Sequence, residues 1–172
     1  MLSLFPFPVS TLHVMSNHLH RAVIQWEQPA VEFLKGKYSR DHTWTFDGGA
    51  VISASAAPSV VPAPWTNAAF IDPEEAMVGS LSSCHMLSFL HIASRHGFQV
   101  ASYRDEATGM MGKTERGIPW VAAVTLHPAV TYSGEKRPSG EEEAHLHHLA
   151  HEQCFIANSV KTEITVSPVA AS

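Results

Sequence analysis

The chain has 172 residues and a formal net charge of −5 at neutral pH, with 45% hydrophobic and 16% charged residues. This composition is ordinary for a globular protein, and the length allows one domain with a real core. The negative charge argues against a nucleic-acid partner, because no basic stripe is available to neutralise phosphates. The two cysteines are too few for a secreted disulfide scaffold and indicate a reducing, cytoplasmic location.

The first part of the chain, residues 1–19, is weakly hydrophobic, and we interpret it as a poorly ordered tail before a single domain at residues 20–172. It lacks a basic start and a clean cleavage site, and two prolines interrupt it. No segment approaches the roughly 18 apolar residues that a membrane-spanning helix needs, so no membrane partner is expected.

The domain is predicted to begin with strands. Residues 20–28 alternate loosely, and residues 42–46 and 50–56 flank an Asp-Gly pair at Asp47, which is a strong signal for a hairpin. Residues 58–65 contain three prolines and are predicted to be an extended connector.

A long helix is predicted over Asp72–Gly97. Asp72 can cap it, Pro73 suits its first position, and Glu75 can reach back to the cap. Gly97 supplies the left-handed residue that commonly ends a helix. The pattern therefore places a single well-bounded helix at the centre of the sequence.

The chain after this helix is predicted to hold two long half-buried strands, residues 98–113 and 117–132, joined by a turn at Thr114–Gly117. A second helix is predicted over residues 141–154 and a last strand over residues 161–169. The elements follow no regular βαβ rhythm, so the sequence indicates an α+β fold with a mostly antiparallel sheet.

The two cysteines lie on the two predicted helices. Cys84 is in the middle of the first helix and Cys154 at the end of the second, which permits reversible disulfide chemistry; the alternative is that Cys84 is a small core residue. Attack by a thiol requires the thiolate, so a free thiol with a pKa near 8.5 needs a cation or a helix-end field. The sequence leaves the cation open among four candidates: Arg40, Arg104, Lys113 and Lys161.

Two segments carry a family resemblance. DPEEAMVGSLSSCHM at residues 72–86, followed by HEQCFIANSVKTEITV at residues 151–166, resembles the OsmC/Ohr family of thiol-dependent hydroperoxide reductases, and is closest to its OsmC-like branch. The resemblance extends from about His20 to Val169. It implies an OsmC-like fold, with curved antiparallel sheets wrapped around two central helices in an intertwined homodimer and two active sites at the subunit interface.

The resemblance also implies roles for four residues. Cys84 matches the peroxidatic cysteine and Cys154 the resolving cysteine. Arg40 stands before an Asp-Gly turn and Pro58 at the family's spacing, so it inherits the arginine role, and Glu74 inherits the role of the carboxylate.

The implied reaction, a part of oxidative-stress defence, reduces organic hydroperoxides to alcohols through a Cys84 sulfenic acid that Cys154 resolves. An external dithiol, of which a lipoyl-type dithiol is one candidate, reduces the disulfide, and neither metal nor organic cofactor is implied. One departure concerns Phe155 and Ile156, which follow Cys154 where the peroxide-resistance branch typically carries Pro-Tyr.

Five apolar residues near the two cysteines are candidates to line a pocket for an alkyl chain: Met77, Leu81, Met86, Phe89 and Phe155. Glu74 lies ten positions before Cys84, about 15 Å along a straight helix, so it cannot easily contact the cysteine of its own helix. We therefore hypothesise that the partner's Glu74 meets Arg40 and Cys84 and that each site is shared.

The histidines of the second helix suggest a different class of function. His147 and His151 are spaced i, i+4, and His145 and His148 are spaced i, i+3, so either pair could hold a transition metal, with His85 a tempting third ligand. The plainer interpretation is a solvated helix face. A further alternative is a non-catalytic protein that uses the same fold to hold an apolar ligand at the dimer interface.

Overall fold

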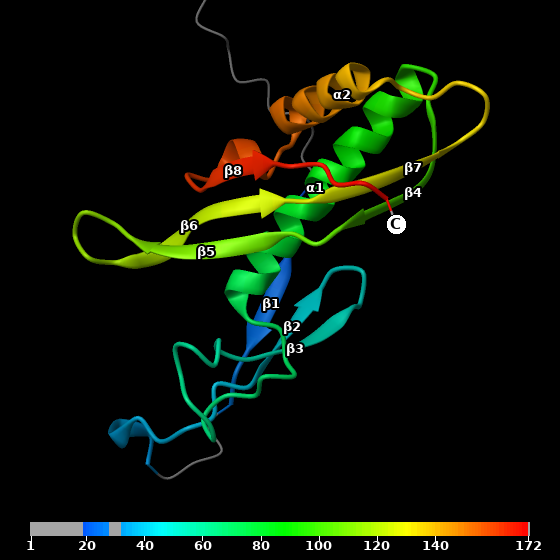
Figure 1. Ribbon diagram of the computed structural model, residues 1–172. Helices are drawn as coiled ribbons and strands as arrows, with labels where there is room; N and C mark the ends of the chain where they lie inside the picture. The colour runs from blue at the N-terminus through cyan, green and yellow to red at the C-terminus, as the bar shows by residue number, and fades with distance from the viewer. Residues whose placement is uncertain (1–18, 28–31, 172) are drawn as a thin grey trace, which may run out of the picture.

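A computed structural model describes residues 19–27 and 32–171 of the chain, so the predicted tail at residues 1–19 lies almost wholly outside the described residues. The long helix α1 (Pro73–Arg95) links two parts of the molecule (Figure 1). A small sheet lies at its N-terminal end, and the other helix and strands pack along the rest of it. The α+β class predicted from the sequence is confirmed.

The small sheet has three antiparallel strands in sequence order: β1 (Ala22–Gln25), β2 (His42–Phe46) and β3 (Val51–Ala54). A short 3₁₀ helix, η1 (Phe33–Lys35), precedes β2. The predicted Asp-Gly hairpin is confirmed, because Phe46 N donates to Ala50 O at 2.9 Å and Gly49 adopts a φ of 84°. The observed β1 and β3 are shorter than the stretches predicted for them.

The predicted boundaries of α1 are confirmed by its caps. Asp72 Oδ1 accepts a hydrogen bond from Glu75 N at 2.7 Å, and Glu75 Oε2 accepts one from Asp72 N at 3.2 Å. Pro73 occupies the first helical position, and Gly97, just after the helix, has a φ of 78°. Local sequence alone thus fixes where this helix begins and ends.

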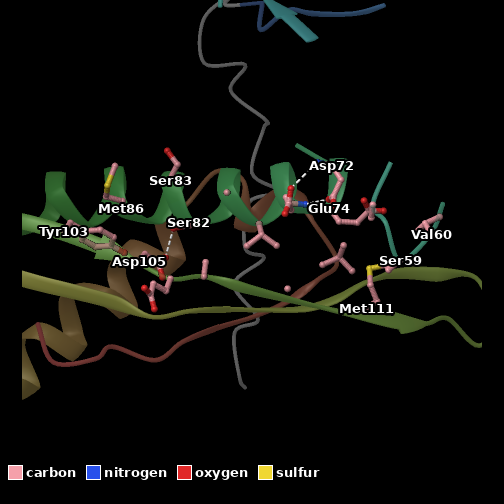
Figure 2. A pocket seen from close by; sticks show the side chains of 18 residues that line it. Ser59, Val60, Asp72, Glu74, Ser82, Ser83, Met86, Tyr103, Asp105 and Met111 are labelled. Atoms are coloured by element: carbon pink, nitrogen blue, oxygen red, sulfur yellow. Dashed lines mark hydrogen bonds between the residues drawn. The ribbon is translucent and has the colours of Figure 1, made fainter. Parts of the chain in front are cut away.

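The two long strands predicted after α1 are each broken in the structure, which has four strands there: β4 (Gln99–Asp105), β5 (Thr108–Lys113), β6 (Pro119–Leu126) and β7 (Pro128–Ser133). β4 pairs with β7 and β5 with β6, so they form one long interrupted hairpin. Asp105 fixes the break, since its carboxylate accepts bonds from His127 N at 2.6 Å and from Ser82 Oγ of α1 at 2.5 Å (Figure 2).

The rest of the chain forms three elements: α2 (Gly140–Gln153), the 3₁₀ helix η2 (Ala157–Ser159) and β8 (Glu163–Val166). A capping box of Ser139 and Glu142 starts α2. β8 pairs with β6 in parallel, which departs from the otherwise antiparallel pairing of the named strands.

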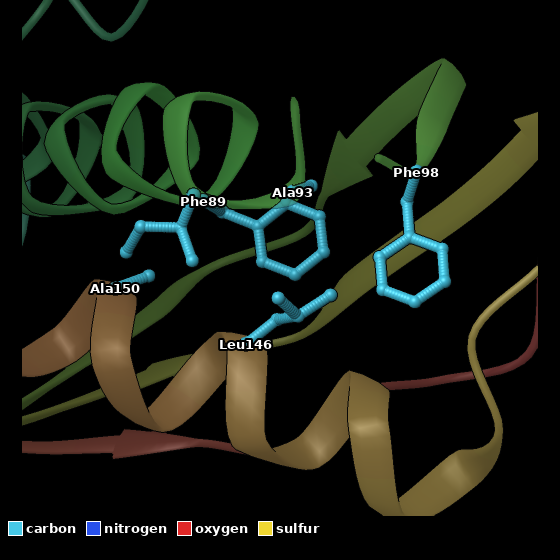
Figure 3. Packing of buried hydrophobic residues seen from close by; sticks show 6 residues of the cluster. Phe89, Ala93, Phe98, Leu146 and Ala150 are labelled. Atoms are coloured by element: carbon cyan, nitrogen blue, oxygen red, sulfur yellow. The ribbon is translucent and has the colours of Figure 1, made fainter. Parts of the chain in front are cut away.

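The core lies where α1 packs on α2 and on the sheets. Buried residues of α1 recur at helical spacing, from Leu81 through Phe89 to Ala93. Phe89 and Ala93 pack against Leu146 and Ala150 of α2 (Figure 3). Leu81 belongs to a second cluster, which it forms with buried residues of β6.

By length and composition alone α1 would suffice to cross a membrane, contrary to our expectation that no segment approaches this length. The core helix of a soluble protein passes the same test. Here α1 carries a stripe of buried residues that packs against α2 and against β4, β5 and β6.

A buried pair of imidazoles joins α1 to α2. His85 and His147 are 1% and 3% exposed, His85 Nε2 lies 3.1 Å from His147 Nδ1, and their rings stack with an interplanar angle of 8°. His147 also stacks on Phe89, with ring centroids 4.2 Å apart. Burial is the main cause that lowers the pKa of both histidines to about 4, and nearby imidazoles lower it further.

Acidification from pH 6.5 towards pH 4 should therefore destabilise the fold. The folded-state pKa of each buried imidazole is lowered, so in this range the unfolded chain binds more protons and the free energy of unfolding rises with pH. Urea unfolding at several pH values measures this slope. The double variant His85→Leu/His147→Leu should flatten it, whereas the exposed control His91→Gln should keep it; an unchanged slope in the double variant would contradict this assignment.

Candidate functional site

The packing of α1 on α2 brings the two cysteines together. Cys84 is partly exposed in the middle of α1, and Cys154, the C-cap residue of α2, is 1% exposed. Both are free thiols, and a hydrogen bond links them. Each sulfur also accepts a bond from the following turn: Ile156 N lies 3.5 Å from Cys84 Sγ, and Ala157 N lies 3.5 Å from Cys154 Sγ.

The environment of Cys154 favours the protonated thiol. Burial, followed by the hydrogen bond with Cys84, raises the pKa of Cys154 to about 11, although the backbone amides of Ala157 and Ile156 act in the opposite direction. At neutral pH Cys154 is therefore almost wholly a thiol. Any reaction that uses the Cys154 thiolate therefore requires deprotonation of this thiol or stabilisation of its charge.

Arg40 lies away from the thiols in this chain. It precedes β2, its Nη1 donates to the carbonyl oxygens of Gly36 and Tyr38, and its guanidinium stacks on the Tyr38 ring at 3.7 Å. Among the described residues, no hydrogen bond or ion pair joins Arg40 to Glu74 or to either cysteine. Its inherited role thus stays a prediction that a single protomer does not display.

Glu74 is in the first turn of α1 and half-buried. The helix continues without interruption to Cys84, so the rise of about 1.5 Å per residue keeps the two about 15 Å apart. The separation expected from the sequence is therefore present, and Glu74 does not serve the cysteine of its own helix.

A pocket of about 710 Å³ runs along another face of α1, between that helix, the segment before it and β4–β6 (Figure 2). Among the described residues its charged lining is acidic, without Lys, Arg or His; the five carboxylates are Asp72, Glu74, Glu75, Asp105 and Glu106. Asp72 and Glu75 bond each other's backbone, Asp105 holds the strand break, and Glu106 pairs with Arg104 at 2.6 Å. Glu74 is the one of the five without a hydrogen bond or ion pair to a described residue.

Only Met86 of the five predicted pocket residues lines this pocket. Leu81 and Phe89, at 1% and 0% exposure, are buried in this chain on the stripe of α1 that packs against α2 and β6. Neither lines this pocket, and the assignment of the five residues to a substrate pocket stays a prediction. Met77 packs beside Leu81, and Phe155 is 76% exposed.

The histidines of α2 do not gather into a metal centre. Among residues 19–27 and 32–171, no group of three or more His, Cys, Asp or Glu side chains is arranged to hold a metal ion. His147 is engaged with His85, and His148 lies 3.4 Å from Glu152. His145 is exposed. The metal-binding alternative therefore gains no support from the geometry.

Sequence reasoning missed the His85–His147 pair and the amides of Ile156 and Ala157. The pairing of His85 with His147 depends on how two helices cross, which no local pattern specifies. The amide donors belong to the backbone, so residue type gives no signal for them; only the position of the turn after Cys154 hints at their presence.

The two thiols should differ in reactivity. With iodoacetamide at pH 7.5, we expect Cys84 to be alkylated at least tenfold faster than Cys154, because Cys154 is buried and its pKa is raised. Mass spectrometry of peptides containing each cysteine gives both rates, and the same reaction in 8 M urea is the control, where the rates should converge. Equal rates in the folded protein would contradict the described environment.

Comparison with known proteins places these features in a family. The OsmC-like protein family matches residues 66–169. An OsmC-like protein of unknown function from Vibrio cholerae is 48% identical, with a TM-score of 0.86 over 88% of this chain and 99% of that one. No curated protein matches the chain in sequence.

More distant structures share the fold. The organic hydroperoxide resistance protein of Elizabethkingia anophelis is 17% identical, with a TM-score of 0.67 over 92% of this chain and 99% of that one. The organic hydroperoxide resistance protein OhrB of Bacillus subtilis is 16% identical, with a TM-score of 0.61 over 91% of this chain and all of that one. The family match, the fold and the high identity to the Vibrio protein agree, and the chain belongs to the OsmC-like protein family.

Proposed function

We propose that this protein is a cysteine-based peroxidase that reduces organic hydroperoxides at the expense of a dithiol. The observation that carries the proposal is the contact between Cys84 and Cys154, two free thiols on different helices. A core cysteine needs no such partner, whereas redox-active cysteines often lie next to a resolving cysteine. Family membership and the organic hydroperoxide resistance proteins among the structural neighbours support the same reaction class.

The first step takes place at Cys84. Its thiolate attacks one oxygen of the peroxide, the O–O bond breaks, and the alkoxide leaves and takes a proton to become the alcohol. The sulfur is thereby oxidised to a sulfenic acid. Cys84 suits this step better than Cys154 because it is partly exposed, so a peroxide can reach it without opening the core.

The second step uses Cys154. Its thiolate attacks the Cys84 sulfur, hydroxide leaves and becomes water, and a disulfide joins α1 to the end of α2. The existing contact between the two sulfurs means that little movement is needed. An external dithiol, lipoyl-type or another, then reduces the disulfide and returns both thiols.

The protein acts in this proposal as an intertwined homodimer. The small sheet β1–β3 exposes several apolar side chains, namely those of Val23, Ile24, Val51 and Ile52. A small sheet needs a packed hydrophobic face for independent stability, and exposed apolar patches mark interaction surfaces. A second copy of the chain that wraps around this sheet would cover Ile24 and Ile52 on one face and Val23 and Val51 on the other.

The dimer would also complete each site. Among the described residues of its own chain, Arg40 makes no ion pair and Glu74 makes neither a hydrogen bond nor an ion pair. In the part of the chain that the structure describes, no hydrogen bond joins a Lys or Arg side chain to either sulfur. We therefore assign Arg40 and Glu74 of one protomer to the thiols of the other, where Arg40 would polarise the peroxide and Glu74 would orient its guanidinium.

Cysteine variants test the order of the two steps. Cys84→Ser should reduce hydroperoxide turnover to the uncatalysed level, since no other residue forms the sulfenic acid. Cys154→Ser should consume one equivalent of cumene hydroperoxide and then stop, with Cys84 trapped by dimedone. Peroxide consumption and mass spectrometry give both results.

In a thiol-coupled assay the unaltered protein should consume cumene hydroperoxide. The control variant Ser80→Ala, an exposed change on the same helix, should keep the same rate of consumption. Full turnover in Cys84→Ser would overturn the peroxidase proposal. A dimedone adduct at a residue other than Cys84 would move the chemistry elsewhere, and absence of turnover in the unaltered protein would favour the binding-protein alternative.

Mixed dimers test the shared site. Arg40→Ala and Cys84→Ser should each be inactive alone, but co-refolded chains should regain activity. In a heterodimer the intact Cys84 of the Arg40→Ala chain meets the intact Arg40 of the Cys84→Ser chain, which gives one active site of two. Because about half of the dimers in an equal mixture are heterodimers, up to about one quarter of all sites should be active. Light scattering confirms the dimer; a monomer, or a mixture as inactive as its parts, would contradict a site shared in this way.

A further inference from the structure

The turn after α2 directs two successive backbone amides at the thiols. Cys154 caps α2, and η2 begins at Ala157, so Phe155 and Ile156 make the link. Ile156 N donates to Cys84 Sγ and Ala157 N to Cys154 Sγ, each at 3.5 Å. Both donors belong to the backbone, so neither depends on the side chain of Ile156 or Ala157.

The amide of Ile156 acts on both sulfurs. Besides its bond to Cys84, it is one of the two backbone amides that lower the pKa of Cys154, against the larger effects of burial and of the contact with Cys84. The Ala157 amide acts on Cys154. The structure thus places one amide donor at each sulfur, and the amide of Ile156 also contributes to lowering the pKa of Cys154.

These donors fill a need that neither helix meets. Cys84 lies in the middle of α1, where the backbone amides are engaged within the helix. Cys154 lies at the C-terminal end of α2, where the carbonyl groups concentrate negative partial charge and oppose a thiolate. The cation of the predicted site, Arg40, bonds elsewhere in its own chain.

We propose that the Ile156 amide is a catalytic hydrogen-bond donor that serves the two thiolates in turn. It stabilises the negative charge on the Cys84 sulfur before that sulfur attacks the peroxide, and then the charge on the Cys154 sulfur before it attacks the sulfenic acid. The inference rests on the proposed function and deepens it, because it names the group that serves both steps. Preorganised amides aimed at a developing charge need no reordering during the reaction.

The position of Cys154 makes a direct test possible. A thioester of residues 1–153 can be ligated to a synthetic peptide of residues 154–172, which begins with the native cysteine. Replacing the peptide bond before Ile156 with an ester removes its N–H and leaves every side chain in place. The all-amide protein made by the same ligation is the matched control, and melting curves check that both fold.

The readout is alkylation of Cys84 against pH, which requires no peroxide. With the Ile156 ester, we expect the rate of Cys84 alkylation at neutral pH to fall about tenfold, in keeping with the loss of a hydrogen bond to a charged group. An ester at Ala157 should leave Cys84 alkylation unchanged and slow the closure of the Cys84–Cys154 disulfide.

Ile156→Pro provides a second variant, because the φ of −68° at Ile156 is the value that proline adopts. It should reproduce the slower Cys84 alkylation, whereas Ile156→Val should not. If Cys84 is alkylated at the same rate in the Ile156 ester as in the all-amide protein, the proposal is overturned. An ester effect in a protein without peroxidase activity would instead contradict the proposed function and leave the donor in place.

Discussion

The contact between α1 and α2 is the constraint on which the candidate site depends. Phe89 and Ala93 of α1 pack against Leu146 and Ala150 of α2, and the two alanines let the helices approach closely. Cys84 and Cys154 continue the same contact at the C-terminal end of α2. Because packed helices hold both sulfurs, their separation is set by the core rather than by flexible loops. Changes far from the thiols that alter this crossing should therefore be felt at the thiols.

Burial along this contact has opposite effects on acids and bases. It lowers the pKa of the His85 and His147 imidazoles and raises the pKa of the Cys154 thiol, because in each case the charged form loses water. The interior between the helices is consequently neutral at neutral pH. Charge that chemistry creates there has to be met by fixed dipoles, such as the Ile156 amide, or by charges from another protomer.

Features encoded by neighbouring residues were predictable from the sequence. The capping box at Asp72 and the Asp-Gly hairpin follow from local chemistry. The approach of Cys84 to Cys154, seventy positions apart, was expected from the family resemblance instead. The strand break at Asp105 was missed because an alternating apolar pattern continues across it, while the carboxylate that fixes the break bonds a distant helix. Of the residues predicted to line a substrate pocket, Met86 lines the pocket along α1 and Phe89 lies in the core, because nearness in sequence to Cys84 does not give the same helix face.

The raised pKa of Cys154 fits the work of a resolving thiol better than that of an attacking one. A peroxide in solution is dilute, so a thiol that is almost wholly protonated would rarely react with it. The sulfenic acid at Cys84 is instead held beside Cys154, and such proximity corresponds to effective concentrations of about 10⁵ M or more. A thiolate fraction of about 10⁻⁴ at neutral pH, which a pKa of about 11 implies, is then no obstacle. A thiolate of high pKa is also the stronger nucleophile. Burial therefore lowers the fraction of Cys154 that is thiolate, but the thiolate that forms still attacks the sulfenic acid readily.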